Sequence, residues 1–356
     1  MIKIDGSYLE GGGQILRTSL ALSTLLQQPV EINDIRKGRQ NPGLSHQHLH
    51  SVKALATLSN GAVEGAAFGS QKIIFIPGQI KGRTLSVNIE TAGSITLLLQ
   101  ALLIPSIFSG EKIRLKITGG TDVKWSQPFD YFNLVFIPQL KKYADIEVKL
   151  LSRGYYPKGN GKVDITIKPK YTLKTLTEAP KINLVGQGKL FLIKGVSHAS
   201  RDLEKAEVAE RQARAAKLQL NSLNIPVKIE SIYSNTLSTG SGITVAALFS
   251  KTDELDEINP VILGADALGE KTKRSEEVGK EAAEKLLQQI KTKAAVDEHL
   301  ADNLIPFLGL CSGTIKVANI TNHTLTNIYV TEQFLGKIFE VNRKENLISA
   351  SKKQSF

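Results

Sequence analysis

The sequence predicts a mixed α/β fold in which a strand–helix–strand–helix unit occurs three times, with a smaller α/β domain inserted between the second and third copies. Apolar residues follow strand and helix periods in the same order at three places along the chain. Gly12 and Gly93 stand at equivalent strand-to-helix turns. A length of 356 residues also exceeds one ordinary core. We therefore expect a main body over residues 1–181 and 275–356, and the inserted domain over residues 182–274.

The elements of the main body follow from these periods. In the first unit we expect strands at Ile2–Ile4 and Val30–Ile35, and helices at Gln14–Leu26 and Gly43–Leu58. Asn60-Gly61 then supplies a left-handed helix end. In the second unit we expect strands at Thr84–Ile89, Lys112–Ile117 and Ile146–Leu151, and helices at Gly93–Ile104 and Pro128–Tyr143. In the third we expect helices at Val296–Leu310 and His323–Phe334, and strands at Thr314–Ile320 and Lys337–Val341.

The middle of the chain departs from this repeat. It predicts strands at Lys189–Lys194, Val227–Tyr233 and Ile243–Phe249, a long charged helix at Leu203–Leu223, and a flexible turn at Ser238–Gly242. A charged helix at Ser275–Lys291, with Ser275 as its N-cap, is expected to return the chain to the main body. Ala350–Phe356 is expected to be a frayed tail.

Composition narrows the class of protein. The formal net charge of +11 favours a polyanionic partner such as nucleic acid. The single cysteine, Cys311, excludes a disulfide within the chain and a four-cysteine zinc site. The most apolar run, Ile95–Phe108, is too short to span a bilayer, and Met1 leads straight into strand-like sequence. We expect no membrane association and a reducing, cytoplasmic location.

The run Glu10-Gly-Gly-Gly-Gln-Ile-Leu-Arg17 predicts an anion site at a helix start. Glycine leaves the backbone amides uncovered, and the helix start adds unpaired N–H groups and partial positive charge. Gln14 and Arg17 share one face of that helix. Glu10 would repel an anion unless a divalent cation lay between them, so the run indicates a metal-bound polyphosphate. A tight turn followed by an exposed arginine is the alternative.

Basic residues and histidines gather in the segment from Arg36 to His50, which contains Arg36, Arg39, Gln47 and His48. We interpret it as an anion-binding wall, with a solvated basic face as the alternative. His46 and His50 are one turn apart, but no carboxylate or cysteine is near them, which disfavours a permanent metal site.

Two further polar faces lie near the C-terminus. His299, Asp302 and Asn303 share one side of a helix start and could read a nucleobase edge, although acidic residues are common at helix starts. His323 stands where a strand runs into a helix. A neutral imidazole there can act as nucleophile, general base or ligand, or can simply cap the helix.

Taken together, these segments resemble the RNA 3′-terminal phosphate cyclase family. The matching stretches are Glu10-Gly-Gly-Gly-Gln-Ile-Leu-Arg17, Arg36-x-Gly-Arg39-x-x-Pro-Gly-Leu with Gln47-His48-Leu, Gly93-Ser94 with Gln100, Gly119-Gly-Thr-Asp122, Arg153-Gly-Tyr-Tyr-Pro157-x-Gly159, His299-Leu-Ala-Asp302 and His323-x-Leu-Thr-Asn327. The similarity is spread over the main body and is weaker in the inserted region.

The resemblance implies three βαβαββ units with an inserted α/β domain, and an ATP-dependent activity on RNA ends. In the family a histidine takes AMP from ATP and releases pyrophosphate. AMP then moves to an RNA 3′-phosphate, and the adjacent 2′-hydroxyl closes a 2′,3′-cyclic phosphate as AMP leaves. The implied partners are ATP, RNA with a 3′-phosphate end, and Mg²⁺ or Mn²⁺.

The resemblance also implies a role for individual residues. His323 matches the nucleophile, and Glu10 matches the carboxylate that holds the metal on the ATP phosphates. Arg36, Arg39, Gln47 and His48 match groups at the phosphate and RNA-end site. The nucleotide-binding set is Gln14, Arg17, Gln100, Pro128, His299, Leu300, Ala301, Asp302 and Asn303.

Three residues depart from the family pattern; the departure at Asn160 is mild, because asparagine tolerates left-handed backbone angles, and those at His299 and Asn303 concern fine nucleotide preference. Asn160 replaces a glycine, His299 stands where a tyrosine is often found, and Asn303 replaces a common glutamine. Two other activities stay open at this point: a catalytically silent relative that binds RNA during ribosome maturation, and a small-molecule transferase, because enolpyruvyl transferases are built from comparable repeats. The sequence leaves the physiological RNA, the oligomeric state and the choice of metal open.

Overall fold

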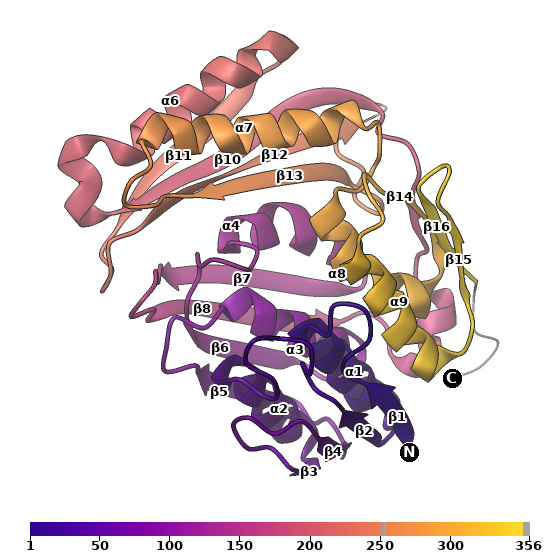
Figure 1. Ribbon diagram of the computed structural model, residues 1–356. Helices are drawn as coiled ribbons and strands as arrows, with labels where there is room; N and C mark the ends of the chain where they lie inside the picture. The colour runs from indigo at the N-terminus through magenta and orange to yellow at the C-terminus, as the bar shows by residue number, and fades with distance from the viewer. Residues whose placement is uncertain (251, 253, 352–356) are drawn as a thin grey trace.

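The computed structural model describes residues 1–250, 252 and 254–351, and three of the sheets in this part of the chain repeat one topology (Figure 1). The first unit contains β1 Ile2–Asp5, α1 Gly13–Leu26, β2 Val30–Asn33, α2 His46–Ser59, β3 Ala62–Glu64 and β4 Ile73–Ile76. The second contains β5 Arg83–Asn88, α3 Ile95–Phe108, β6 Ile113–Gly119, α4 Phe129–Tyr131, the π-helical turn η1 Phe132–Phe136, α5 Ile137–Leu140, β7 Ala144–Ser152 and β8 Gly161–Pro169. The third contains β9 Ile182–Leu184, α8 Glu298–Cys311, β14 Gly313–Lys316, α9 Asn322–Leu335, β15 Phe339–Asn342 and β16 Leu347–Ala350.

The strand orders of these sheets are equivalent: β1-β2-β4-β3, β5-β6-β8-β7 and β9-β14-β16-β15. In each sheet the first two strands in the chain are parallel and the remaining pairs are antiparallel. Parallel neighbours need a crossover, and a helix supplies it in every unit. The predicted fold class is therefore confirmed, with three βαβαββ units.

The helices of the three units pack on one another. Helix α1 contacts α3 and α9, and α8 contacts both α3 and α9. One hydrophobic cluster runs through all three units and includes Leu20 of α1, Leu99 of α3 and Phe307 of α8, each almost completely buried. Because these helices share a core, their first turns are brought close together even though they are far apart in the sequence.

The remaining elements form a second α/β layer. They are β10 Lys189–Ser200, α6 Val208–Leu220, β11 Val227–Ser234, β12 Ser241–Ser250, β13 Val261–Leu268 and α7 Ser275–Lys291. Helices α6 and α7 cover the outer face of the sheet β11-β10-β12-β13, and its inner face packs on α4 and η1 (Figure 1). Every residue of β12 is buried, because both faces of this central strand are covered. Three short 3₁₀ helices, η2 Leu173–Glu178, η3 Arg201–Ala206 and η4 Asn221–Leu223, complete the connections.

Two elements that begin at the predicted domain boundaries, residues 182 and 275, contact the unit on the other side of the boundary. Strand β9 begins at Ile182 but pairs in parallel with β14 of the third unit. Helix α7 begins at Ser275 but packs on α6, β12 and β13, and Val278, Ala282 and Leu286 belong to the core of the inserted layer. From these contacts we infer that the inserted unit runs from Lys189 to Lys291.

Several strands were not predicted, namely β3, β4, β8, β9, β13 and β16. Most of them contain only three or four residues, too few for a period-2 pattern to stand out. Strand β14 is also shorter than predicted: it ends at Lys316, and Val317 forms only an isolated bridge with Val296. Ala350, predicted to begin a frayed tail, pairs in β16, and residues 352–356 of that prediction lie outside the described part.

Two predicted helices are interrupted. The stretch predicted from Pro128 to Tyr143 contains the π-helical turn η1, because Pro138 has no N–H to donate to the preceding turn. The stretch predicted from Leu203 to Leu223 is broken at Glu207, which has a left-handed φ of 50°. Ser275 is the first residue of α7 and Arg274 its N-cap, one residue earlier than predicted. No helix in the described ranges is both long and apolar enough to cross a membrane.

Candidate active site

A cavity of about 910 Å³ lies between the main body and the inserted layer. Its walls come from the first turns of α1, α8 and α9, from α3, from the segment 125–127, and from β13 and α7. Eleven residues predicted from the sequence line it: Glu10, Gln14, Arg17, Arg36, Arg39, His48, Gln100, His299, Asp302, Asn303 and His323. The packing of the repeated units therefore gathers into one cavity motifs that are separated by hundreds of residues.

The glycine run forms the entry to α1. Gly11 has a left-handed φ of +53°, and Gly12 is the N-cap of the helix. A Cβ atom on Gly13 would lie 2.0 Å from Nε2 of His48. The imidazole of His48 therefore lies directly against the backbone at the start of α1, where only glycine leaves room for it.

Arg17 is a buried cation on the cavity wall. It is 9% exposed, and its Nε has no hydrogen-bond partner among the described residues. Burial lowers the pKa of Arg17 to about 10, so the guanidinium stays protonated at neutral pH. A buried N–H without an acceptor is costly, and an anion in the cavity would satisfy it.

His48 is held as a neutral donor. Its Nδ1 accepts a hydrogen bond from the backbone N–H of Ser45 at 3.1 Å, which assigns the ring proton to Nε2. Burial, with the charges of Arg17 and Arg36, lowers the pKa of His48 to about 3. The Nε2–H beside Gly13 can therefore bind an anion at neutral pH without adding a positive charge.

His323 meets the glycine run at Glu10 and at Gln14. Its Nε2 lies 3.3 Å from Oε2 of Glu10, and Nη2 of Arg39 lies 3.5 Å from the same oxygen. The Gln14 side chain donates a hydrogen bond of 3.1 Å to the backbone carbonyl of His323, 309 residues away in the chain. The side chains of His323 and Glu10 remain 46% and 36% exposed. An imidazole nitrogen, a carboxylate and a guanidinium are thus open to one ligand.

A polar network joins α8 to α9 at the base of His323. Asp302 accepts hydrogen bonds from the hydroxyls of Thr321 and Thr324, at 3.0 and 2.7 Å. The Asn327 amide donates to the Asp302 carbonyl, and Thr18 of α1 donates to Asn327. Burial raises the pKa of Asp302 to about 6, although Thr324, Thr321 and His323 oppose the increase. The network fixes the first turn of α9, and with it the backbone of His323.

A second network of amide side chains lines the recessed part of the cavity. Gln100 donates to Asn303 at 2.8 Å, and Asn303 donates to Gln127 at 3.0 Å. Both Asn303 and Gln127 donate to the backbone carbonyl of His299. The His299 ring lies edge-on to Tyr131. Amide groups that pair with one another here can exchange those hydrogen bonds for the polar edge of a ligand.

Four predicted site residues lie elsewhere. Gln47 joins the first two units, since it donates to the carbonyl of Ser94 at 2.9 Å and accepts from the N–H of Ser94 at 2.7 Å. The side chains of Leu300 and Ala301 are buried in the main core. Pro128 is the buried N-cap of α4. These four residues do not line the cavity.

The cavity also contains residues that sequence reasoning missed. Trp125, Ser126 and Gln127 come from the loop before α4, and the inserted layer contributes Gly264, Ala265, Asp266, Lys285, Gln288 and Gln289. Nothing in the pattern of the inserted segment marks these residues, because they reach the cavity through the packing of β13 and α7. Trp125 is the single tryptophan of the chain, and it stands three residues after the Gly119–Asp122 motif. That position was the one signal in the sequence that could have marked it as a cavity residue.

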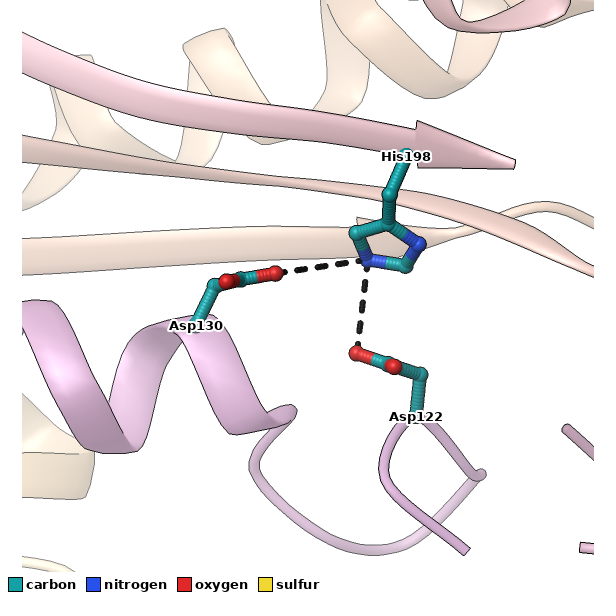
Figure 2. Close-up of side chains that lie close together, drawn as sticks. All are labelled: Asp122, Asp130 and His198. Carbon is teal, nitrogen blue, oxygen red and sulfur yellow. Dashed lines mark ion pairs between the residues drawn. The ribbon is translucent and has the colours of Figure 1, made fainter. Parts of the chain in front are cut away.

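A separate buried cluster joins the loop before α4 to the inserted layer. Figure 2 shows His198, which projects from β10 toward Asp122 and toward Asp130 of α4, with Nε2 3.3 and 3.7 Å from their carboxylates. Arg153 pairs with the same carboxylates at 3.1 and 2.7 Å, and the Tyr155 hydroxyl lies 2.8 Å from Nδ1 of His198.

The three groups Asp122, Asp130 and His198 lie close enough together to hold a metal ion. The guanidinium of Arg153 already pairs with both carboxylates, however, so a cation between them would meet a like charge. Burial acts to raise the pKa of Asp122, but His198 and Arg153 outweigh it and hold that pKa well below its usual range. We interpret the cluster as an internal ion network that holds the loop to β10.

Comparison with known proteins gives a consistent result. A family model described as RNA 3′-terminal phosphate cyclase matches residues 8–341. The chain is 50% identical over 342 residues to the RNA 3′-terminal phosphate cyclase of Pyrococcus furiosus, covering 96% of this chain and 95% of that protein. It is 43% identical over 356 residues to the protein of the same name from Methanopyrus kandleri, covering 97% and 96%. For the protein of that name from Saccharolobus solfataricus, identity is 42% over 348 residues, with 97% of each chain covered.

Proposed function

The chain belongs to the RNA 3′-terminal phosphate cyclase family, and we propose that it converts an RNA 3′-terminal phosphate to a 2′,3′-cyclic phosphate at the expense of ATP. The observation that carries this proposal is the contact of His323 with the glycine-rich turn that precedes α1. Nε2 of His323 lies 3.3 Å from Glu10, on the cavity wall that also holds Arg17, whose Nε has no hydrogen-bond partner in the described part of the chain. A nucleophile and an anion site are the two groups that nucleotidyl transfer requires.

In the first step Nε2 of His323 attacks the α-phosphorus of ATP. A nitrogen–phosphorus bond forms, the bond from that phosphorus to the bridging oxygen breaks, and pyrophosphate leaves. Gln14 and the Asp302 network hold the backbone of the histidine, so little reorientation is needed. The covalent histidine–AMP keeps the phosphoryl group activated for the second acceptor.

In the later steps AMP moves from His323 to an oxygen of the RNA 3′-phosphate, and the adjacent 2′-hydroxyl attacks the RNA phosphorus. The new ring bond forms as AMP leaves, and the hydroxyl proton passes to solvent or to a base. The attack is intramolecular and gains from proximity. DNA lacks the 2′-hydroxyl, which accounts for the preference for RNA.

The phosphates are assigned to the basic wall. Arg17 has an unpaired N–H, His48 presents Nε2–H beside Gly13, and Arg39 reaches the glycine turn. These donors surround the N-terminus of α1, where the helix dipole also favours negative charge. We assign the adenosine to the recessed amide network of Gln100 and Asn303.

Glu10 fits a divalent cation delivered with ATP, either Mg²⁺ or Mn²⁺. Its side chain is 36% exposed, and Arg39 and His323 approach the same oxygen, Oε2. Mg²⁺ commonly uses one or two carboxylates and takes its other ligands from phosphates and water. When bound, the cation would neutralise charge on the phosphates. We also propose a cytoplasmic setting, where a free cysteine such as the buried Cys311 stays reduced.

The proposal is tested by incubating the protein with magnesium and ATP labelled at the α-phosphate. Wild-type protein should become labelled through an acid-labile bond, and His323→Ala should not. His46→Ala is the matched control, because His46 is an exposed histidine outside the cavity lining, and it should label normally. Absence of label on the wild-type chain would contradict the proposal and leave an RNA-binding relative as the better description.

A second arm separates the two RNA steps. An RNA with a 3′-phosphate should yield a 2′,3′-cyclic end. An oligonucleotide of the same sequence with a 2′-deoxy terminal residue should accept AMP but should not cyclise, because the attacking hydroxyl is missing. Cyclisation without prior labelling of His323 would contradict the assigned order of steps.

A further inference from the structure

Trp125 is displayed to solvent at the rim of the cavity. It is the single tryptophan of the chain, it is 94% exposed, and it contributes to the lining of the cavity. Its φ of 67° lies in the left-handed region, which a bulky residue rarely adopts. Exposure of a whole indole is unfavourable in a free protein, and strained residues of this kind concentrate at binding sites.

The loop that carries Trp125 is held firmly at both ends. The N–H of Phe129 donates to the carbonyl of Thr121 at 3.0 Å and closes the loop. Inside it, the Ser126 hydroxyl donates to the carbonyl of Val123, and the Thr96 hydroxyl donates to the carbonyl of Gln127. The indole is therefore presented by an ordered segment.

The ion network in Figure 2 fixes the same loop to the inserted layer. Asp122 stands at its beginning and Asp130 just after its end, and His198 of β10 contacts both carboxylates. Lys124, which precedes Trp125 in the chain, pairs with Glu270 at 3.2 Å, so its ammonium already has a partner. Trp125 therefore presents an uncharged aromatic face at the rim of the cavity.

We propose that Trp125 is the stacking platform for the terminal base of the RNA whose 3′-phosphate enters the cavity. This inference rests on the proposed cyclase function. Stacking on an aromatic ring is the general way in which proteins hold unpaired bases. Every base has a π face, so the platform accepts any terminal nucleotide, whereas hydrogen bonds to a base edge would select one.

The position of the ring favours RNA over ATP as its partner. The base of ATP is assigned to the recessed wall, where Gln100 and Asn303 pair with each other at 2.8 Å. A mononucleotide can lie wholly inside the cavity, but an RNA strand has to leave across the rim. A side chain that is 94% exposed at that rim meets the part of the ligand that extends outward.

The single tryptophan makes a direct optical test possible. A short RNA with a 3′-phosphate should quench the intrinsic fluorescence of the wild-type protein, and ATP alone should not. Trp125→Ala should weaken binding of a dye-labelled RNA of this kind roughly 5- to 150-fold, the range expected for one stacked base. Trp125→Phe should retain most of the affinity. Trp125→Ala should leave unfolding and the labelling of His323 by ATP unchanged.

The second test compares wild type and Trp125→Ala with an RNA whose terminal nucleotide lacks its base, which forms a double-mutant cycle with the first test. Trp125→Ala should not weaken its binding further, because the platform has no base to hold. An equal loss for the abasic RNA, or quenching by ATP with a slower labelling of His323, would overturn the inference and leave the cyclase proposal intact. If RNA quenches Trp125 but the wild-type chain never becomes labelled, the cyclase proposal fails, and Trp125 is left as a stacking residue for RNA without a role in cyclisation.

Discussion

Gly13→Ala tests whether the imidazole of His48 packs against the start of α1. The new Cβ would lie 2.0 Å from Nε2 and 2.8 Å from Cδ2 of His48, far inside van der Waals contact. The ring cannot swing away freely, since its Nδ1 accepts a hydrogen bond from the Ser45 N–H and His48 is only 7% exposed. Overpacking of this kind costs about 1–3 kcal/mol, and the higher helix propensity of alanine returns up to about 1 kcal/mol. A contact of 2.0 Å places the cost near the upper end of that range, so we expect a net loss of about 2–3 kcal/mol in the free energy of unfolding.

The measurement is denaturant unfolding, with Gly12→Ala as the matched control. A Cβ on Gly12 would meet Nη2 of Arg39 at 3.5 Å, an ordinary contact, and its φ of −83° suits alanine. Because Gly12 is the N-cap of α1, where alanine is less favourable than glycine, the control should lose up to about 1 kcal/mol, less than Gly13→Ala loses. In a His48→Ala background, Gly13→Ala should lose its cost, giving a coupling energy of at least about 1 kcal/mol. Equal stability of the two alanine variants, or an undiminished cost without His48, would refute the reasoning.

Two further predictions concern pH and the contact between units. Burial raises the pKa of Asp302 to about 6 from its ordinary value of 3.8, so the folded state holds this proton more tightly. Its contribution to stability is complete below about pH 4 and is lost as the pH rises through about 6. The unfolding free energy of wild type should therefore fall relative to Asp302→Asn across this window, and a constant difference would contradict the assignment. Gln47→Ala should cost about 1–3 kcal/mol, because it leaves the N–H of Ser94 without its acceptor, while the Ser94 carbonyl keeps the N–H of Leu98 at 3.3 Å. The KM for ATP should not change, and a rise in KM without a loss of stability would restore Gln47 to the phosphate site.

Local patterns were sufficient for most of the main body. The helices α1, α8 and α9 were predicted to within two residues of their observed ends, since apolar period and turn residues act over a few positions. The same reasoning failed at Pro138 and Glu207, where one residue interrupts an otherwise helical stretch. It also failed for strands as short as β9, whose existence depends on a partner strand more than 100 residues away.

The candidate site shows the same division. The chemical types at Glu10, Arg17 and His323 are visible in the sequence, because the residues stand at turns and helix starts that local rules identify. Gln47 shows the limit of this reasoning: the family resemblance implied a phosphate contact, but in the structure its side chain joins two units through Ser94. Which side of a helix faces a ligand depends on the elements that cover the other sides.

By itself, the sequence determined the repeated pattern and the glycine turn, since each depends on residues close together in the chain, and its family resemblance implied His323 as the nucleophile candidate. The tertiary structure decided that Nε2 of His323 lies 3.3 Å from Glu10, that Nε of the buried Arg17 has no hydrogen-bond partner among the residues described, and that Trp125 stands at the rim. The physical reason is that burial and distance are set by non-local packing. The shared core of the helices brings the three helix starts together, and the inserted layer then closes the cavity over them.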